Sequence, residues 1–478
     1  MFDQIINFLD VNLSNVLIVV LILGGLYFTI RTKFVQFRLF GEQIRSVTEK
    51  PKGKNSVSSF QALMVSTASR VGTGNIIGVS TALCLGGFGS VFWMWVIAII
   101  GASSAFIEST LAQIYKKRGK DGCYGGPAYY IQAALKKRGL AVFFSVILIL
   151  TYGVGFNMLA SYNLQSTFST YEFYNTTCTI SGAGANFTFN IMPWIIGGLT
   201  ALLVAFCLFG GGKRLIKATS LIVPIMGLAY ILVALVITAM NIPALPSIFR
   251  TIFTEAFNFK AIFGGFAGSC LMYGIMRGLF SNEAGVGSAP NASSSAAVSH
   301  PVKQGLVQVL SVFIDTLLVC SATAFMCMSS GVTPTAEISG AVYVQQSLQT
   351  TLGDFGPIFI TVAMVLFAFT TLIGNLFYVD KAFNHILGKD PSKKFKTTYY
   401  IIASALILLG ALLKANTLWN ISNVLMSCMT LINMPVIVIL GKYAFRALDD
   451  YTKQRKEGKD PIFKAKNIQL PHQTDYWN

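Results

Sequence analysis

The chain of 478 residues is 54% hydrophobic and only 12% charged, and its mean hydropathy is +0.62. A soluble domain holds about one quarter charged residues, so this composition excludes a soluble globular protein. The net charge of +17 alone would suit a nucleic-acid-binding protein, but its distribution along the chain argues against that function.

Runs of mostly apolar residues, each long enough to cross about 30 Å of hydrocarbon as a helix, recur from end to end of the chain. They predict eleven transmembrane helices, at about residues 14–31, 58–86, 89–115, 139–168, 191–209, 215–240, 261–297, 303–330, 355–382, 398–413 and 417–441. No stretch is left over for a soluble domain. We therefore expect one all-α polytopic membrane protein.

The basic residues are distributed unevenly between the two sides of the predicted membrane. No Lys or Arg precedes Arg31, at the end of the first apolar run, which indicates an uncleaved anchor with its N-terminus outside. In that orientation 31 of the 36 Lys and Arg residues fall on one side, and three fall on the other, at Arg250, Lys260 and Lys414. This positive-inside pattern predicts a cytoplasmic basic tail over 442–478 and a multi-pass protein of the plasma (inner) membrane.

Motifs of nucleotide and metal chemistry are missing from the sequence. GTGNIIG at 72–78 is one residue too long for the dinucleotide fingerprint, and FGGGKRL at 209–215 lacks the hydroxyl that follows Lys in a phosphate-binding loop. HExxH, GxSxG and CxxC do not occur. We predict neither an enzyme nor a nucleic-acid-binding protein.

Two of the predicted spans are interrupted by glycine and polar residues. The first contains TASRVGTGNIIG (67–78) and the second YGIMRGLFSNEAGVGSAPNASSS (273–295). Irregular backbone inside a membrane is tolerated where it lines a cavity or is buried in protein. Ionisable residues at this depth mark a pathway, a site or a buried partner, and the candidates are Arg70, Glu108, Arg277, Glu283 and Asp315.

The positions of the interrupted spans predict an internal repeat. If 1–57 is an additional span and loop, ten spans remain, and each interrupted span opens a set of five, over 58–240 and 241–441. Five is an odd number, so the second set is inverted relative to the first, as in one class of secondary transporters. The half-helix N-termini would attract a carboxylate and the exposed carbonyls an ammonium group or sodium, which together suit an amino acid.

Four segments carry a family resemblance. SRVGTGNIIGVSTALCLGGFGSVFWMWV, GLFSNEAGVGSAP, HPVKQGLVQVLSVFIDTLLVC and FAFTTLIGNLFYVD resemble the alanine or glycine:cation symporter family of the amino acid–polyamine–cation superfamily, over about residues 58–440. The resemblance implies a leucine-transporter-like fold of 5+5 inverted repeats with two broken helices. It also implies uptake of small neutral amino acids driven by Na⁺, or in some members by H⁺.

The resemblance assigns roles to residues of this chain. The expected substrate-binding residues are Gly72, Thr73, Gly74, Asn75, Gln165, Ser281, Asn282, Gly285, Gly287 and Asn375, with the backbone at Glu283. The expected sodium ligands are the carbonyls of Thr67 and Ala68 and the hydroxyls of Thr370 and Thr371, since a hard cation prefers oxygen. Arg70, Glu108, Arg277, Glu283 and Asp315 are either mutual structural partners or ligand contacts.

Asn375 departs from the family, whose members commonly have Trp there. An amide leaves more space than an indole and offers hydrogen bonds, so glutamine joins alanine and glycine as an expected substrate. Proton coupling through Glu283, a channel and a non-transporting amino acid sensor are the alternatives. We expect a monomer whose partners are the bilayer and the amino acid.

Overall fold

The computed structural model describes residues 2–49, 56–119, 122–182, 185–258, 262, 265, 269–470 and 474–477. Lys260 and part of the predicted span 261–297 lie outside these residues.

Within the described part of the chain, nine helical stretches are long and apolar enough to cross a membrane. They are α1 (Phe2–Arg31), α6 (Ser90–Ile114), α8 (Arg138–Leu148) with η2 (Ile149–Gly155) and α9 (Phe156–Ser166), α10 (Met192–Phe209), α11 (Gly211–Met240), α16 (Pro301–Val312) with η7 (Phe313–Cys320) and α17 (Ser321–Met328), α19 (Phe355–Leu387), α20 (Lys393–Leu412) and α21 (Ala415–Lys456). Large apolar side chains on their outer faces, such as Leu202 and Phe206, are 69% and 70% exposed, as a lipid-facing surface requires.

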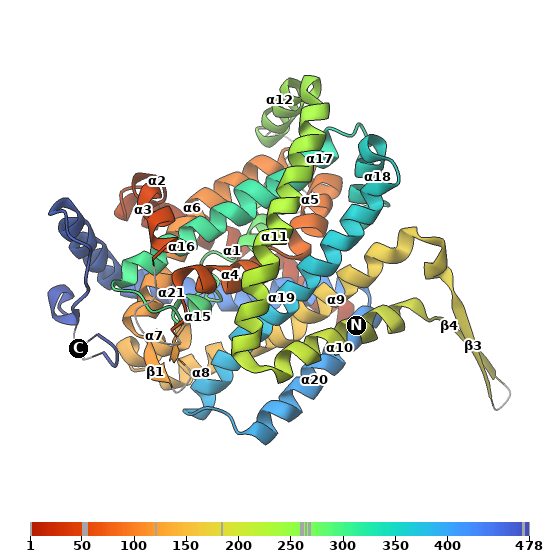
Figure 1. The fold of residues 1–478 in the computed structure, drawn as a ribbon. Coiled ribbons are helices and arrows are strands. Elements are labelled where there is room, and N and C mark those ends of the chain that lie inside the picture. The colour runs from red at the N-terminus through yellow and green to blue at the C-terminus, as the bar shows by residue number, and fades with distance from the viewer. Residues whose placement is uncertain are drawn as a thin grey trace.

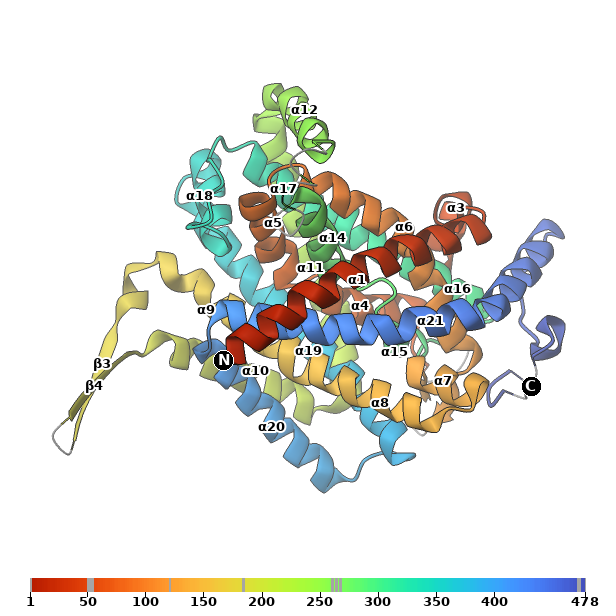
Figure 2. The same cartoon turned by 180° about the vertical axis from the view of Figure 1, so that it is seen from behind.

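The other two predicted spans, 58–86 and 261–297, are broken in the structure. The first consists of α4 (Ser59–Arg70), the π-helical turn η1 (Gly74–Gly78) and α5 (Val79–Gly86). The second consists of α14 (Cys270–Asn282) and the short α15 (Pro290–Ser293). Both pass through the middle of the molecule (Figures 1 and 2), so the breaks lie inside the protein.

The remaining elements lie at the periphery. They are α2 (Val35–Arg38), α3 (Phe40–Val47), β1 (Lys117–Gly119), β2 (Gly122–Tyr124), α7 (Pro127–Leu135), η3 (Thr167–Thr170), η4 (Glu172–Asn175), β3 (Thr177–Gly182), β4 (Ala185–Asn190), η5 (Ile242–Ala244), α12 (Leu245–Ala256), α18 (Ala341–Leu352) and η8 (Ala465–Ile468). The strands form two antiparallel hairpins, which pair Lys117 with Tyr124 and Thr177 with Asn190. The second hairpin projects away from the helices (Figure 1).

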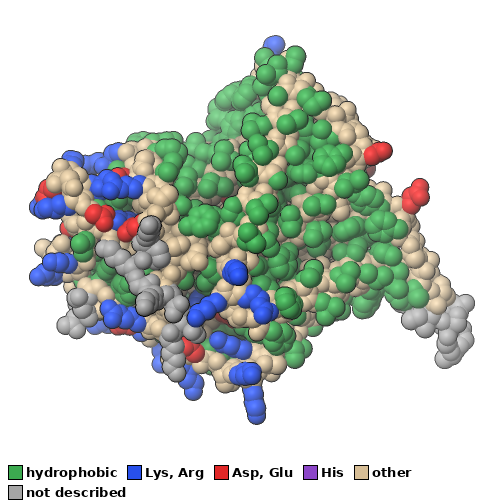
Figure 3. Space-filling view, viewed as in Figure 1, with side chains coloured by type: hydrophobic (Ala, Val, Ile, Leu, Met, Phe, Trp, Pro, Cys, Tyr) green, Lys and Arg blue, Asp and Glu red, His purple; other side chains and the backbone are tan. Residues whose placement is uncertain are grey.

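The last helix continues past its predicted end at residue 441. α21 lies beside α1 (Figure 2) and runs on to Lys456. Its extension keeps one buried face, formed by Ala444, Ala447, Leu448 and Tyr451, at a spacing typical of an amphipathic helix. On the face shown in Figure 3, Lys and Arg gather at the end of the molecule that holds the C-terminus.

Candidate functional site

The first break is stabilised by a side chain of the same segment. The backbone N–H of Gly72 donates to Asn75 Oδ1 at 2.7 Å, although in a regular helix it would donate to the carbonyl of Ala68. The helix therefore ends at Arg70, and the Ala68 carbonyl lacks its usual helical donor. A Cβ atom at position 72 would lie 2.0 Å from Thr371 Oγ1, so the close approach of α19 requires glycine there.

The second break depends on left-handed backbone. Glu283 has a φ of +52°, and Gly285 and Gly287 have φ angles of +85° and +91°, which glycine adopts at no steric cost. Asn282 Oδ1 accepts the N–H of Ala284 at 3.0 Å. The GVG sequence therefore turns the chain before α15 begins at Pro290.

One buried carboxylate joins the two breaks. Asp315 Oδ1 accepts from Asn75 Nδ2 at 2.7 Å, and Asp315 Oδ2 accepts from the hydroxyls of Ser281 and Thr316, both at 2.8 Å. Asn282 Nδ2 donates to Thr316 Oγ1 at 3.3 Å. The structure thus brings together three of the predicted substrate residues around Asp315, which the sequence indicated only as an ionisable residue.

A second polar chain runs from the break at Glu283 to α19 and α9. Ser69 Oγ lies 3.3 Å from Glu283 Oε1 and 2.6 Å from Asn375 Oδ1. Asn375 Nδ2 donates in turn to Asn157 Oδ1 at 2.9 Å, and Ser288 Oγ donates to Glu283 Oε2 at 2.7 Å. Asn375 is fully buried, and Ser69 links it to the break.

A third cluster holds the glycines of the second break. Glu108 Oε1 accepts the N–H of Gly285 at 3.3 Å, and Glu108 Oε2 accepts from Asn433 Nδ2 at 2.8 Å. Asn433 Nδ2 also donates to the Gly285 carbonyl at 2.9 Å, and Tyr130 OH donates to Asn433 Oδ1 at 2.5 Å. Glu108 is thus a partner of the break itself.

The two intramembrane arginines have different surroundings. Arg70 is 2% exposed and donates to Gln308 Oε1 at 3.0 Å. Its Nε and Nη2 have no hydrogen-bond partner among the described residues. Arg277 instead lies over the Trp419 ring, 4.1 Å from its centroid, and interacts electrostatically with Asp10. Arg70 lines the same cavity as Glu283, described next, whereas Arg277 does not.

A small cavity lies where the breaks, α9 and α19 meet. It is lined by Ser69, Arg70, Gly72, Thr73, Gly74, Phe156, Leu159, Ala160, Phe280, Glu283 and Thr371. Its volume is about 10 Å³, room for about one water. Phe280 packs between Phe156 and Trp419, at ring-centroid distances of 4.6 and 4.8 Å. Any amino acid would enter only after these side chains move.

Seven of the ten predicted substrate-binding residues are absent from this lining, namely Asn75, Gln165, Ser281, Asn282, Gly285, Gly287 and Asn375. Asn75 faces Asp315 and Asn375 is bonded to Ser69. Gln165 Oε1 accepts from Tyr174 OH at 2.5 Å, beyond the end of α9. Sequence reasoning in turn missed Ser69, Asn157 and Asn433, whose signal was a polar side chain within an apolar span, and Phe156 and Phe280, which resemble ordinary packing residues.

The predicted sodium ligands differ in whether their oxygen atoms already have a hydrogen-bond partner. Thr371 Oγ1 is buried and has no hydrogen-bond partner in the described part of the structure, and it lies against the backbone of Gly72. Thr370 Oγ1 donates to the carbonyls of its own helix at Leu366 and Phe367. The Thr67 carbonyl, the predicted ligand atom, accepts the N–H of Val71 at 2.7 Å. An orphaned hydroxyl that lies against the first break at Gly72 suits a hard cation.

Gly72→Ala should abolish ligand binding in this cavity. The added methyl would meet Thr371 Oγ1 at 2.0 Å, a distance that forces α4 and α19 apart, and overpacking of this kind costs about 1–3 kcal/mol. We expect loss of ligand-dependent thermal stabilisation in purified protein. Gly227→Ala is the control, because a Cβ there meets nothing within 4 Å; equal behaviour of the two variants would contradict the proposed packing.

Comparison with known proteins agrees with this geometry. A model of the sodium:alanine symporter family matches residues 1–465. The chain is 42% identical over 476 residues to the amino-acid carrier protein AlsT of Bacillus subtilis, covering 100% of this chain and 98% of that protein. It is 41% identical to the probable sodium/glutamine symporter GlnT of the same organism, covering 95% of this chain and 91% of the relative.

A more distant relative and a solved structure extend the comparison. The sodium/proton-dependent alanine carrier protein of Bacillus sp. (strain PS3) is 34% identical, with 91% of this chain and 96% of that protein covered. The crystal structure of MhsT in complex with L-phenylalanine, a leucine-transporter-like fold, superposes with a TM-score of 0.54 at 14% identity, over 83% of this chain and 92% of that one. Fold and family agree: this multi-pass membrane protein has the leucine-transporter-like fold and belongs to the sodium:alanine symporter family.

Proposed function

We propose that the protein is a secondary symporter that couples sodium entry to the uptake of a small neutral amino acid by alternating access. The observation that carries this proposal is the meeting of two broken helices at one closed cavity, with Asp315 bonded to both. Relatives named as carriers of alanine and glutamine support an amino acid as substrate.

The substrate would bind across the two breaks. Its carboxylate would face the backbone at Gly72, Thr73 and Gly74, where a helix begins and N–H groups lack helical partners. Its ammonium group would face Glu283 and the neighbouring carbonyls at the end of α14. Phe156, Ala160 and Phe280 would enclose its side chain.

Sodium would bind between α4 and α19. The carbonyls of Thr67 and Ala68 and the hydroxyl of Thr371 are the proposed ligands, and Thr370 is the weaker candidate because its hydroxyl is already bonded. Glu283, whose carboxylate lines the cavity, is the group we would assign to proton coupling, the alternative mode.

Around this site, we propose that the repeats 58–240 and 241–441 have opposite orientations in the membrane and follow an extra segment, 1–57. The protein would lie in the plasma (inner) membrane, with the N-terminus outside and the tail 442–478 in the cytoplasm. It would act as a monomer, since one chain supplies both broken helices.

Uptake into proteoliposomes tests the function. Labelled alanine and glutamine should accumulate under an inward sodium gradient, and glutamine should compete at least as well as alanine. Accumulation driven equally well by a pH gradient without sodium would establish the proton-coupled alternative. Unchanged uptake after both gradients are removed would contradict symport of either kind.

A further inference from the structure

The segment that follows α15 is buried, except at Ala297, which is half-buried. This connector, residues 294–300, leads from the second broken helix to α16, and Ser295, Ala296, Val298, Ser299 and His300 are all less than 8% exposed. Any opening of the cavity that moves α15 must also move the connector. Its contacts therefore bear on how the site opens.

Two of its neighbours are the chain at the end of α6 and the chain ahead of α4. Gln113, at the end of α6, donates through Nε2 to the carbonyls of Ser293 and Ala296 at 2.5 and 3.0 Å. Lys116 Nζ donates to the same Ala296 carbonyl at 2.9 Å. From the chain ahead of α4, the Val57 carbonyl accepts the N–H of Ala297 at 3.0 Å.

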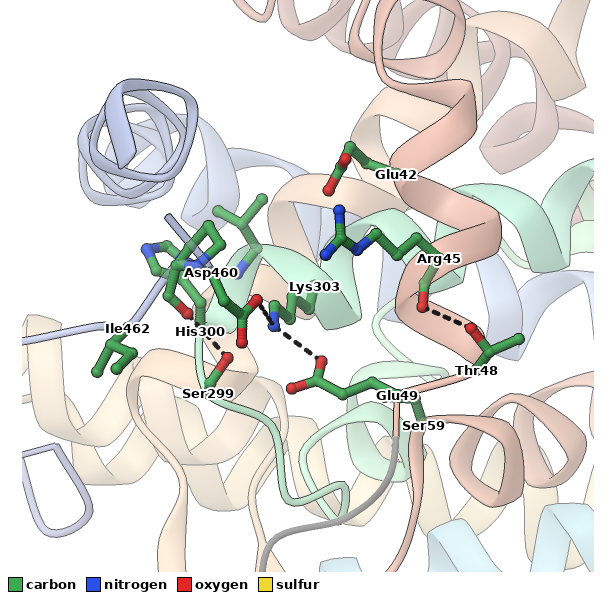
Figure 4. A network of polar contacts seen from close by, with 12 residues as sticks. Glu42, Arg45, Thr48, Glu49, Ser59, Ser299, His300, Lys303, Asp460 and Ile462 are labelled. Atoms are coloured by element: carbon green, nitrogen blue, oxygen red, sulfur yellow. Dashed lines mark hydrogen bonds and ion pairs between the residues drawn. The ribbon is translucent and has the colours of Figure 1, made fainter. Parts of the chain in front are cut away.

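The third neighbour is the C-terminal segment after α21. Pro461 O accepts from Ser299 Oγ at 2.8 Å, and Ser299 O accepts the N–H of Phe463 at 2.9 Å. Lys303, which is 5% exposed, lies between Asp460 at 2.9 Å and Glu49 at 3.0 Å (Figure 4). The ring of Phe463 stands edge-on to that of His300, with centroids 5.2 Å apart.

The end of the tail contacts the same two residues, Gln113 of α6 and Lys116 just after that helix. Trp477 Nε1 donates to the Gln113 carbonyl at 2.7 Å, and Lys116 Nζ lies 3.9 Å from the centroid of the Tyr476 ring. Phe463 and Trp477 contact each other at 5.2 Å between centroids. The tail thus connects α6 to the connector through an aromatic cluster around a buried ammonium group, where a cation–π contact is strongest.

We propose that the described residues 460–470 and 474–477 form a latch that holds the second broken helix closed, and that release of this latch precedes opening of the cavity on its side. This inference rests on the proposed alternating access. Of the three neighbours, the tail alone follows the last predicted span, so it can leave without separating two membrane helices.

Phe463 and Ile462 provide a matched pair for the test. Phe463 is 4% exposed and joins His300 to Trp477, whereas Ile462 is 55% exposed. In a chain with the native cysteines replaced, a reporter Ser295→Cys would be labelled with maleimide. We expect Phe463→Ala to raise the labelling rate about tenfold or more, because 1.4 kcal/mol of lost docking free energy is a factor of ten. Ile462→Ala should leave the rate unchanged.

A second reporter separates release of the latch from general loosening. Cys207, which is 3% exposed on α10, would be retained alone and labelled in the same variants. An increase at both reporters, or at neither, would overturn the latch. Trp477→Ala repeats the measurement should Phe463→Ala fail to yield monodisperse protein. Because labelling needs no transport, a wild type that accumulates no amino acid would contradict the proposed function without deciding the latch.

Discussion

Thr371→Ala should raise the sodium concentration for half-maximal uptake by about tenfold or more. The hydroxyl of Thr371 is buried without a hydrogen-bond partner among the described residues, and it lies against Gly72 where α4 ends. A hard cation would satisfy this oxygen together with the carbonyl of Ala68, and loss of one ligand weakens such a site. Without a cation, a buried unsatisfied hydroxyl lowers the stability of the folded protein by about 1–3 kcal/mol. The bound ion would offset this loss.

Two substitutions make this result specific. Thr371→Ser keeps the oxygen and should retain the sodium dependence of the wild type. Thr370→Ala removes a hydroxyl that already donates to Leu366 O and Phe367 O at 2.9 and 3.1 Å, and it should have little effect. If Thr370→Ala and Thr371→Ala shift the sodium dependence equally, or if neither does, the ion binds elsewhere. The measurement is initial uptake against sodium concentration in proteoliposomes.

The breaks in the two helices were predictable because a membrane tolerates glycine and polar residues inside an apolar run mainly where the backbone is buried in protein or lines a cavity. Gly72 allows the close approach of Thr371, and Gly285 and Gly287 adopt positive φ angles. The predicted apolar spans correspond to helices for a related reason: hydrocarbon thickness fixes helix length.

Partners inside the site were not predictable, since spacing along one helix does not show which neighbouring helix faces it. Arg277 could be grouped with the carboxylates from sequence, but its contacts are with Trp419, which is 142 positions further along the chain. Asn375 shares a helical face with Thr371, yet Ser69 lies between it and the cavity. Its effect on substrate size stays a prediction and would act through Ser69.

The tail was the least predictable part. Its sequence is basic and polar, which is typical of a solvated segment, and only a few aromatic residues indicate otherwise. Phe463 and Trp477 are nevertheless 4% and 9% exposed. Their burial depends on Lys116 and on the connector, whose positions follow from the fold as a whole.

Asp315→Asn should reduce uptake by at least about 100-fold and lower the temperature of unfolding. Its carboxylate accepts three hydrogen bonds, from Asn75, Ser281 and Thr316. An amide would turn a donor toward one of these donors, and breaking a buried charged network costs about 3–5 kcal/mol. Glu172→Gln, at an exposed position of η4, controls for the loss of a carboxylate as such.

An exchange of the two side chains tests whether Asp315 acts by joining the breaks. In the double variant Asn75→Asp/Asp315→Asn, Asp at 75 would accept the N–H of Gly72 with one oxygen and the new amide at 315 with the other. The amide oxygen at 315 would still accept from Ser281 and Thr316, so the hydrogen bond between positions 75 and 315 is re-formed in the reversed sense while those from Gly72 and Ser281 keep their direction. We expect the double variant to recover uptake well above either single variant, a coupling that a double-mutant cycle measures. Additive losses would instead show that the negative charge at 315 itself is needed, for instance to balance Arg70, and that the bond between Asn75 and Asp315 is incidental to transport.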